Sequence, residues 1–258
     1  MRTIETALDA AAGRLPVCVG ATHAATDRCI AFSRQAETAG AAALSVGPPA
    51  LMRVNEAALQ RRYEAVADAT GLPVVVQDFP PLTRVQMAPR FLADLAAAVP
   101  SCRWLKLEHD PTAPKTSAVL VANPDLRVFG GLGGMFMLEE LQRGAIGTMT
   151  GLGFPEVLVA VYRLFAAGHV DAAREIFFRN PPLIRFENRR ASICRCGSRS
   201  TSSGVPSRPG APEHRTRPSM STRSQSSTRS SATCDWIRQA SWRSIHRRPG
   251  GGRRLDPM

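Results

Sequence analysis

The sequence predicts an α/β fold of the (β/α)8 TIM-barrel type, followed by a disordered C-terminal tail. Short apolar segments alternate with amphipathic helical segments up to about Asn188. Strands that are apolar throughout are typical of a parallel sheet covered on both faces. The six strand-like segments have similar lengths and end near Gly, Pro, His or Asp, which favours a barrel. A doubly wound sheet remains the alternative, although no Gly-x-Gly-x-x-Gly follows the first strand.

The expected elements form a simple alternating series. The strands are expected at residues 16–20, 42–46, 73–77, 103–108, 127–129 and 147–150. The helices are expected at residues 3–13, 25–39, 55–70, 88–98, 135–143, 155–167 and 170–179, with a looser helical segment near Thr116.

The net positive charge of the chain comes entirely from its C-terminal region. The formal net charge is +12, yet residues 1–188 hold 18 basic and 18 acidic side chains, while residues 189–258 hold 15 and 3. The predicted barrel region is therefore electrically balanced. Only the Ser-, Arg- and Pro-rich tail has the composition of a disordered, polyanion-binding segment.

Cysteine usage and hydropathy exclude several classes of protein. The six cysteines show no paired Cys-x-x-Cys spacing of the kind that binds structural zinc. The N-terminus lacks the apolar stretch of a signal peptide, and no run of 18 apolar residues occurs. We therefore expect a soluble, cytoplasmic protein that binds no membrane.

Lys106 is the leading candidate for a functional residue. It lies in an apolar strand-like segment, where a charged side chain is costly unless it is paired or neutral. Desolvation lowers the pKa of an amine, and a neutral amine can attack a ketone. The alternative is a lysine at a strand end that simply reaches solvent. A single lysine with few charged neighbours suits imine chemistry better than metal catalysis, so neither a metal nor another cofactor is expected.

Several other polar or glycine positions follow the predicted strands, at the end of a barrel where catalytic groups gather. The glycine-rich run that begins at Gly130 is a weak phosphate-binding signal, and a tight turn explains it equally well. The candidate positions are His23, Gln77, Asp78, Glu108, Gly130, Gly131 and Thr150.

Several short motifs follow one another in a fixed order along residues 3–188. They are Gly13-Arg14-Leu15-Pro16-Val17, Val19-Gly20-Ala21-Thr22, Val46-Gly47-Pro48-Pro49, Pro73 to Pro80, Leu105-Lys106-Leu107-Glu108, Phe129-Gly130-Gly131 and Arg143 to Thr150. In this order the set resembles the dihydrodipicolinate synthase and N-acetylneuraminate lyase family, whose members are class I, Schiff-base-forming aldolases and dehydratases on a TIM barrel.

The resemblance implies that Lys106 forms a Schiff base with a 2-keto acid, either pyruvate-type or a 2-keto-3-deoxy sugar acid. Gly130, Gly131 and the turn at Thr150 are then expected to line the substrate pocket. The resemblance also implies a lyase that acts on a carbon–carbon or carbon–oxygen bond and, in an intact protein, a homo-oligomer.

Two departures from the family pattern stand out. Gln77 occupies the position of the usual tyrosine proton relay, and glutamine cannot transfer a proton. Leu82 occupies the position of a carboxylate-binding arginine, for which the nearby Arg84 is the candidate substitute. These changes suggest a divergent sugar-acid aldolase or dehydratase, in which Glu108, Asp78 or His23 supplies acid–base catalysis.

The family match predicts a partial barrel of about six of eight strands, because the first two strands of the pattern lie outside the sequence. The expected domains are a lyase domain at residues 1–188 and a basic tail at residues 189–258. The tail has two interpretations: a genuine extension, or the product of a reading-frame slip. The slip is favoured because a shifted frame gives plausible helices from Ala191 and from Ser219.

Two hypotheses of function follow. The first is a Schiff-base lyase, either active or, as a truncated chain, inactive. The second is a catalytically dead barrel fragment whose tail binds nucleic acid or an acidic surface. The first is favoured, and nucleic acid is not an expected partner of the barrel region.

Overall fold

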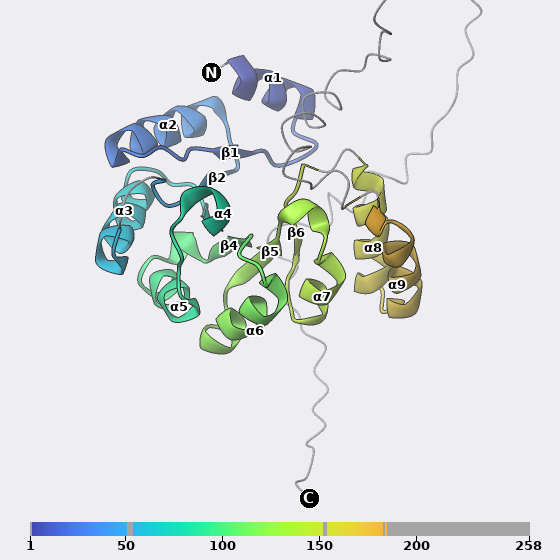
Figure 1. The fold of residues 1–258 in the computed structure, drawn as a ribbon. Helices are drawn as coiled ribbons and strands as arrows, with labels where there is room; N and C mark the ends of the chain where they lie inside the picture. The colour runs from blue at the N-terminus through green and yellow to red at the C-terminus, as the bar shows by residue number, and fades with distance from the viewer. Residues whose placement is uncertain (1, 51–53, 152–153, 183, 185–258) are drawn as a thin grey trace, which may run out of the picture.

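The computed structural model describes residues 2–50, 54–151, 154–182 and 184 (Figure 1). The predicted basic tail at residues 189–258 lies outside these residues. Its disorder, its nucleic-acid binding and the reading-frame slip therefore stay predictions.

Six parallel strands form one sheet in the order β1-β2-β3-β4-β5-β6, each paired with its sequence neighbour. Within the described residues β1 pairs only with β2 and β6 only with β5, so these strands form an open part of a barrel. The α/β class and the partial-barrel prediction are confirmed. The strands are β1 (Cys18–Gly20), β2 (Ala43–Val46), β3 (Val74–Asp78), β4 (Trp104–Leu107), β5 (Arg127–Gly130) and β6 (Gly147–Thr148).

Helices follow the strands and form an arc around them (Figure 1). The last two helices, α8 and α9, pack against each other beyond β6. The helices are α1 (Arg2–Ala11), α2 (Thr26–Ala39), α3 (Glu56–Asp68), α4 (Pro80–Thr83), α5 (Pro89–Ala98), α6 (Thr112–Ala122), α7 (Met137–Gln142), α8 (Pro155–Ala166) and α9 (Val170–Arg179), with 3-10 turns at Pro100–Cys102 and Leu132–Gly134.

Two helices differ from the sequence prediction. The short helix α4 was not expected, but two prolines at its start supply the fixed φ of a first helical turn. Around Thr116 the structure shows a full helix, α6, rather than a loose segment. Pro114 lies in its first turn, where a missing N–H costs nothing, and Thr112, Thr116 and Val119 bury one face at helical spacing.

The two faces of the sheet differ in character because side chains alternate along each strand. One face packs against the helices and forms the main hydrophobic core. Its strand residues include Val19, Leu44, Val74, Val76, Leu105, Leu107 and Val128.

The other face is the inner face of the partial barrel. Gln77, Lys106 and Phe129 are register partners in β3, β4 and β5, so their side chains lie on this same face. All three are partly rather than fully buried. The fold therefore places the candidate lysine inside the barrel, near the carboxyl ends of the strands, as the sequence predicted.

Candidate active site

Lys106 lies on the inner face of β4 and contacts a carboxylate. Its side chain is 17% exposed, and its Nζ lies 3.0 Å from Oε2 of Glu108. Glu108 follows the strand by one residue, and its side chain is only 9% exposed. An amine and a carboxylate in contact at such a place can exchange a proton with each other and with a bound molecule.

Glu108 is held by more than the lysine. The Gln77 amide donates a hydrogen bond of 2.6 Å to the same Oε2, and the backbone N–H of Leu132 lies 3.4 Å from Oε1. Lys106, Gln77 and Glu108 thus come together as the sequence predicted. Gln77 donates this hydrogen bond to the Glu108 carboxylate. The bond orients the carboxylate, and the amide itself does not take up a proton.

The adjacent glycines Gly130 and Gly131 make close contacts on opposite sides of the sheet. A Cβ at Gly131 would lie 2.3 Å from Cγ of Glu108, so only glycine leaves room for that carboxylate. A Cβ at Gly130 would instead lie 1.7 Å from Oε2 of Glu140, on α7. Gly131 therefore borders the Lys106 site, whereas Gly130 packs toward the helix layer. The pocket-lining role expected for both stays a prediction, which the geometry supports for Gly131.

Glu140 is a buried acid that the sequence analysis missed. Its residue is 1% exposed. Burial raises the pKa of Glu140 to about 7, the Thr112 hydroxyl opposes the rise, and the charges of Glu139 and Glu108 add to it. The only sequence signal is an acidic residue between the apolar Leu138 and Leu141, on the face of α7 that is buried.

Asp78 lies on the opposite face of the sheet from Gln77 and Lys106. It is the register partner of Leu107, and its fully buried carboxylate binds Lys115 of α6, with Oδ2 2.5 Å from Nζ. Burial raises the pKa of Asp78, and the Lys115 ammonium opposes that rise. The geometry does not favour the substrate contact expected for Asp78.

Lys115 also contacts a histidine that the sequence analysis did not single out. Its Nζ lies 2.8 Å from Nδ1 of His109, and that Nδ1 lies 3.9 Å from Oδ2 of Asp78. His109 directly follows Glu108 in the loop between β4 and α6. The signal that could have revealed this cluster is that Lys106 and Lys115 are the only lysines in the chain.

Three other predicted residues lie apart from this group. His23 is exposed; its Nδ1 accepts a hydrogen bond from the Ala25 N–H at 3.0 Å, which shapes the loop before α2. Arg84 is exposed and ends α4 with a φ of 62°. Thr150 is partly buried just after β6. In the described part of the chain none of these three side chains forms a hydrogen bond or ion pair with Lys106, and their roles in substrate binding stay predictions.

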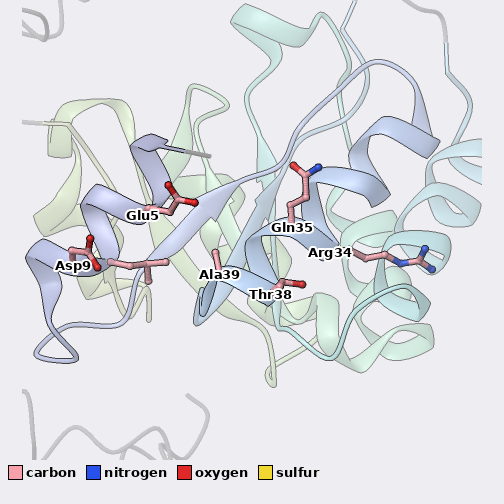
Figure 2. Close-up of a pocket in the computed structure, with 7 residues that line it drawn as sticks. Glu5, Asp9, Arg34, Gln35, Thr38 and Ala39 are labelled. Carbon is pink, nitrogen blue, oxygen red and sulfur yellow. The ribbon is translucent and has the colours of Figure 1, made fainter.

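A hollow of about 460 Å³ lies elsewhere, between α1 and α2. Figure 2 shows Glu5 and Asp9 of α1 on one side and Arg34 and Gln35 of α2 on the other. None of the predicted site residues lines it. Among the residues described, no group of three or more His, Cys, Asp or Glu side chains is placed to hold a metal ion.

The described residues thus form a parallel (β/α) partial barrel, with a largely buried lysine–carboxylate pair near the carboxyl ends of its strands. A model of the dihydrodipicolinate synthetase family matches residues 1–194. The chain belongs to this family, which confirms the resemblance seen in the sequence.

Comparison with individual proteins agrees with this assignment. The chain is 33% identical over 205 residues to an L-2-keto-3-deoxyarabonate dehydratase from Azospirillum brasilense, a match that covers 78% of this chain and 66% of that protein. The dihydrodipicolinate synthase structure from Rhodopseudomonas palustris has a TM-score of 0.65 and 30% identity, over 77% of this chain and 70% of that one.

A third relative adds a bound ligand to the comparison. A prophage protein of the dihydrodipicolinic acid synthase family from E. coli K12, solved in complex with pyruvate, has a TM-score of 0.71 and 23% identity, over 77% of this chain and 68% of that one. At this identity the likeness concerns the fold. The chain spans slightly less than two thirds of the length of the curated relatives it matches. In the described residues no helix is long and apolar enough to cross a membrane.

Proposed function

We propose that the chain is a Schiff-base lyase, in which Lys106 forms an imine with a 2-keto acid. The Nζ of Lys106 attacks the ketone carbon, the ketone oxygen leaves as water, and the resulting iminium is an electron sink for the carbon beside it. The observation that carries the proposal is the 3.0 Å contact between Lys106 and Glu108 inside the barrel. That contact lets the carboxylate take a proton from the ammonium before the attack and return it to the former ketone oxygen, which leaves as water. Glu108 is then a carboxylate again when the next step begins.

Glu108 is also the acid–base group for the step that follows. Once the iminium has formed, the carboxylate removes a proton from C3 and the bonding pair moves toward the iminium nitrogen, which gives an enamine. In a 2-keto-3-deoxy acid the enamine then expels the C4 hydroxyl, which leaves as water after it gains a proton. Gln77 keeps the carboxylate oriented through its 2.6 Å hydrogen bond. Because glutamine stands in place of the tyrosine relay and cannot transfer a proton, Glu108 carries out the proton transfer.

The dehydration of a 2-keto-3-deoxy sugar acid is our preferred reaction. The relative from Azospirillum brasilense is named as a dehydratase of L-2-keto-3-deoxyarabonate, and the pairing of Gln77 with Glu108 fits an enzyme that transfers a proton through a carboxylate. Aldol cleavage or condensation with pyruvate uses the same imine. A turnover assay with L-2-keto-3-deoxyarabonate, against one with pyruvate and an aldehyde, separates these reactions.

Reductive trapping tests the imine directly. The full chain is incubated with pyruvate and sodium borohydride, and its peptides are analysed by mass spectrometry. Because the chain has only two lysines, the position of the adduct is easily resolved. We expect the pyruvate-derived mass on Lys106 and none on Lys115, with the Lys106 adduct absent from Lys106→Met. Absence of an adduct on Lys106 in the folded wild-type chain would overturn the proposal.

A further inference from the structure

The second lysine of the chain has no part in the chemistry described above, yet it is buried at the same end of the barrel. The residue is 9% exposed. Its Nζ lies 2.5 Å from Oδ2 of the fully buried Asp78 and 2.8 Å from Nδ1 of His109. A lysine ammonium offers three donors around one compact charge, and these two contacts use two of them.

Both partners of Lys115 are connected to Glu108 through the backbone. Asp78 neighbours Gln77, whose amide holds the Glu108 carboxylate. The backbone carbonyl of Asp78 accepts a hydrogen bond of 2.8 Å from the N–H of Glu108. His109 is the next residue after Glu108. The Lys115 cluster thus joins the strand that pairs with Glu108, the loop that leaves Glu108, and helix α6.

The buried charges of this cluster depend on one another for stability. A buried ammonium or carboxylate that loses its partner is strongly destabilised, so the three side chains keep one another in place. The 2.8 Å contact between Nζ of Lys115 and Nδ1 of His109 limits how far the imidazole can turn. The ring is therefore fixed in orientation, and with it the backbone that follows Glu108.

We propose that Lys115 is a positioning residue: through Asp78 and His109 it holds Glu108 in the place where its carboxylate reaches Lys106 and the substrate carbon. The proposal rests on the Schiff-base function proposed above. Its consequence is a separation of two steps. The amount of imine present at equilibrium depends chiefly on Lys106, because proton transfer by Glu108 changes only how fast the imine forms. The rate at which the C3 proton is removed depends instead on the placement of Glu108 to within a fraction of an ångström.

Pyruvate tests both steps without requiring the natural substrate. Borohydride trapping measures imine formation at Lys106, and the loss of the pyruvate methyl proton signal in D2O, followed by NMR, measures proton removal from the imine. In Lys115→Met we expect the pyruvate concentration that gives half-maximal trapping to stay within about threefold of the wild-type value. We expect deuterium exchange per trapped site to fall by about 10²-fold, the lower range of an acid–base contribution.

Two further variants make the test decisive. Arg90→Met is the matched control, because it removes a cation from the exposed Arg90–Asp94 pair of α5, and it should change neither measurement. The double variant Asp78→Asn with Lys115→Met removes both charges of the buried pair, so that neither is left unpaired. It is used if Lys115→Met alone fails to fold by circular dichroism, and the same loss of exchange is expected.

The outcomes are distinguishable. If the wild-type chain gives no adduct at Lys106, the proposed function fails. If the adduct forms and exchange in the folded variants equals that of wild type, the positioning role fails. A parallel fall in trapping and exchange, or loss of folding in both variants, assigns Lys115 a purely structural role and also overturns the inference.

Discussion

The carboxylate of Glu108 contacts both the amine of Lys106 and the amide of Gln77 through the same oxygen, Oε2. Its other oxygen lies near the backbone N–H of Leu132. A carboxylate with donors on both oxygens has a fixed orientation, which is what a group that moves a proton at a defined carbon requires. In the proposed mechanism the site is a single acid–base group, Glu108, placed beside a single nucleophile, Lys106.

Replacement of Glu108 with glutamine should separate these two roles. Glutamine keeps the size of the side chain but cannot accept a proton, so in Glu108→Gln we expect the exchange of pyruvate methyl protons to fall by about 10²–10⁴-fold. Borohydride trapping at Lys106 should remain detectable, because the nucleophile is still present. NMR and peptide mass mapping give the two values. Exchange at the wild-type rate in this variant would show that another group removes the proton.

Prediction from sequence succeeded for the strands, because their apolar runs are short and bounded by turn residues. Lys106 was singled out because a lysine within an apolar strand is costly, and its catalytic role stays a prediction. Lys115 was missed because its partner Asp78 lies 37 residues earlier in the chain. No periodicity or spacing reveals such a pairing before the fold brings β3 and α6 together.

At the scale of elements, the contact between β5 and α7 contains the buried acid Glu140. The side chain fills the space that a Cβ at Gly130 would need, and its pKa is raised from 4.5 to about 7 by burial above all. Between these two values the folded state holds a proton that the unfolded state has lost. Stability therefore decreases as the pH rises through this window, by up to about 3 kcal/mol in total.

The variant Glu140→Gln should remove this pH dependence. Its side chain is neutral at every pH, so we expect the free energy of unfolding to match wild type near pH 4.5 and to exceed it by up to about 3 kcal/mol at pH 8. Urea denaturation across this range measures the difference. Glu156→Gln is the control, since Glu156 is exposed in the first turn of α8. Parallel curves for wild type and Glu140→Gln would contradict the assigned pKa.

At the scale of the whole molecule, the described strands form a sheet with two edges, at β1 and β6. Within the described residues β1 pairs only with β2, and Cys18 within it is exposed, whereas Cys29 and Cys102 are buried. An edge strand presents unpaired N–H and C=O groups that can pair with another chain. Pairing of chains through this side of β1 is therefore a testable prediction.

Association through β1 should be visible in the reactivity of Cys18. At low protein concentration we expect iodoacetamide to label Cys18 ahead of Cys29 and Cys102, because it alone of these three is exposed. As concentration rises, light scattering should report a larger mass, and labelling of Cys18 should slow in parallel as the edge becomes covered. Sedimentation in 1 M NaCl separates this from charge-driven association, which salt screens. A larger mass with unchanged Cys18 labelling would place the interface elsewhere, and a constant mass would exclude association through this edge.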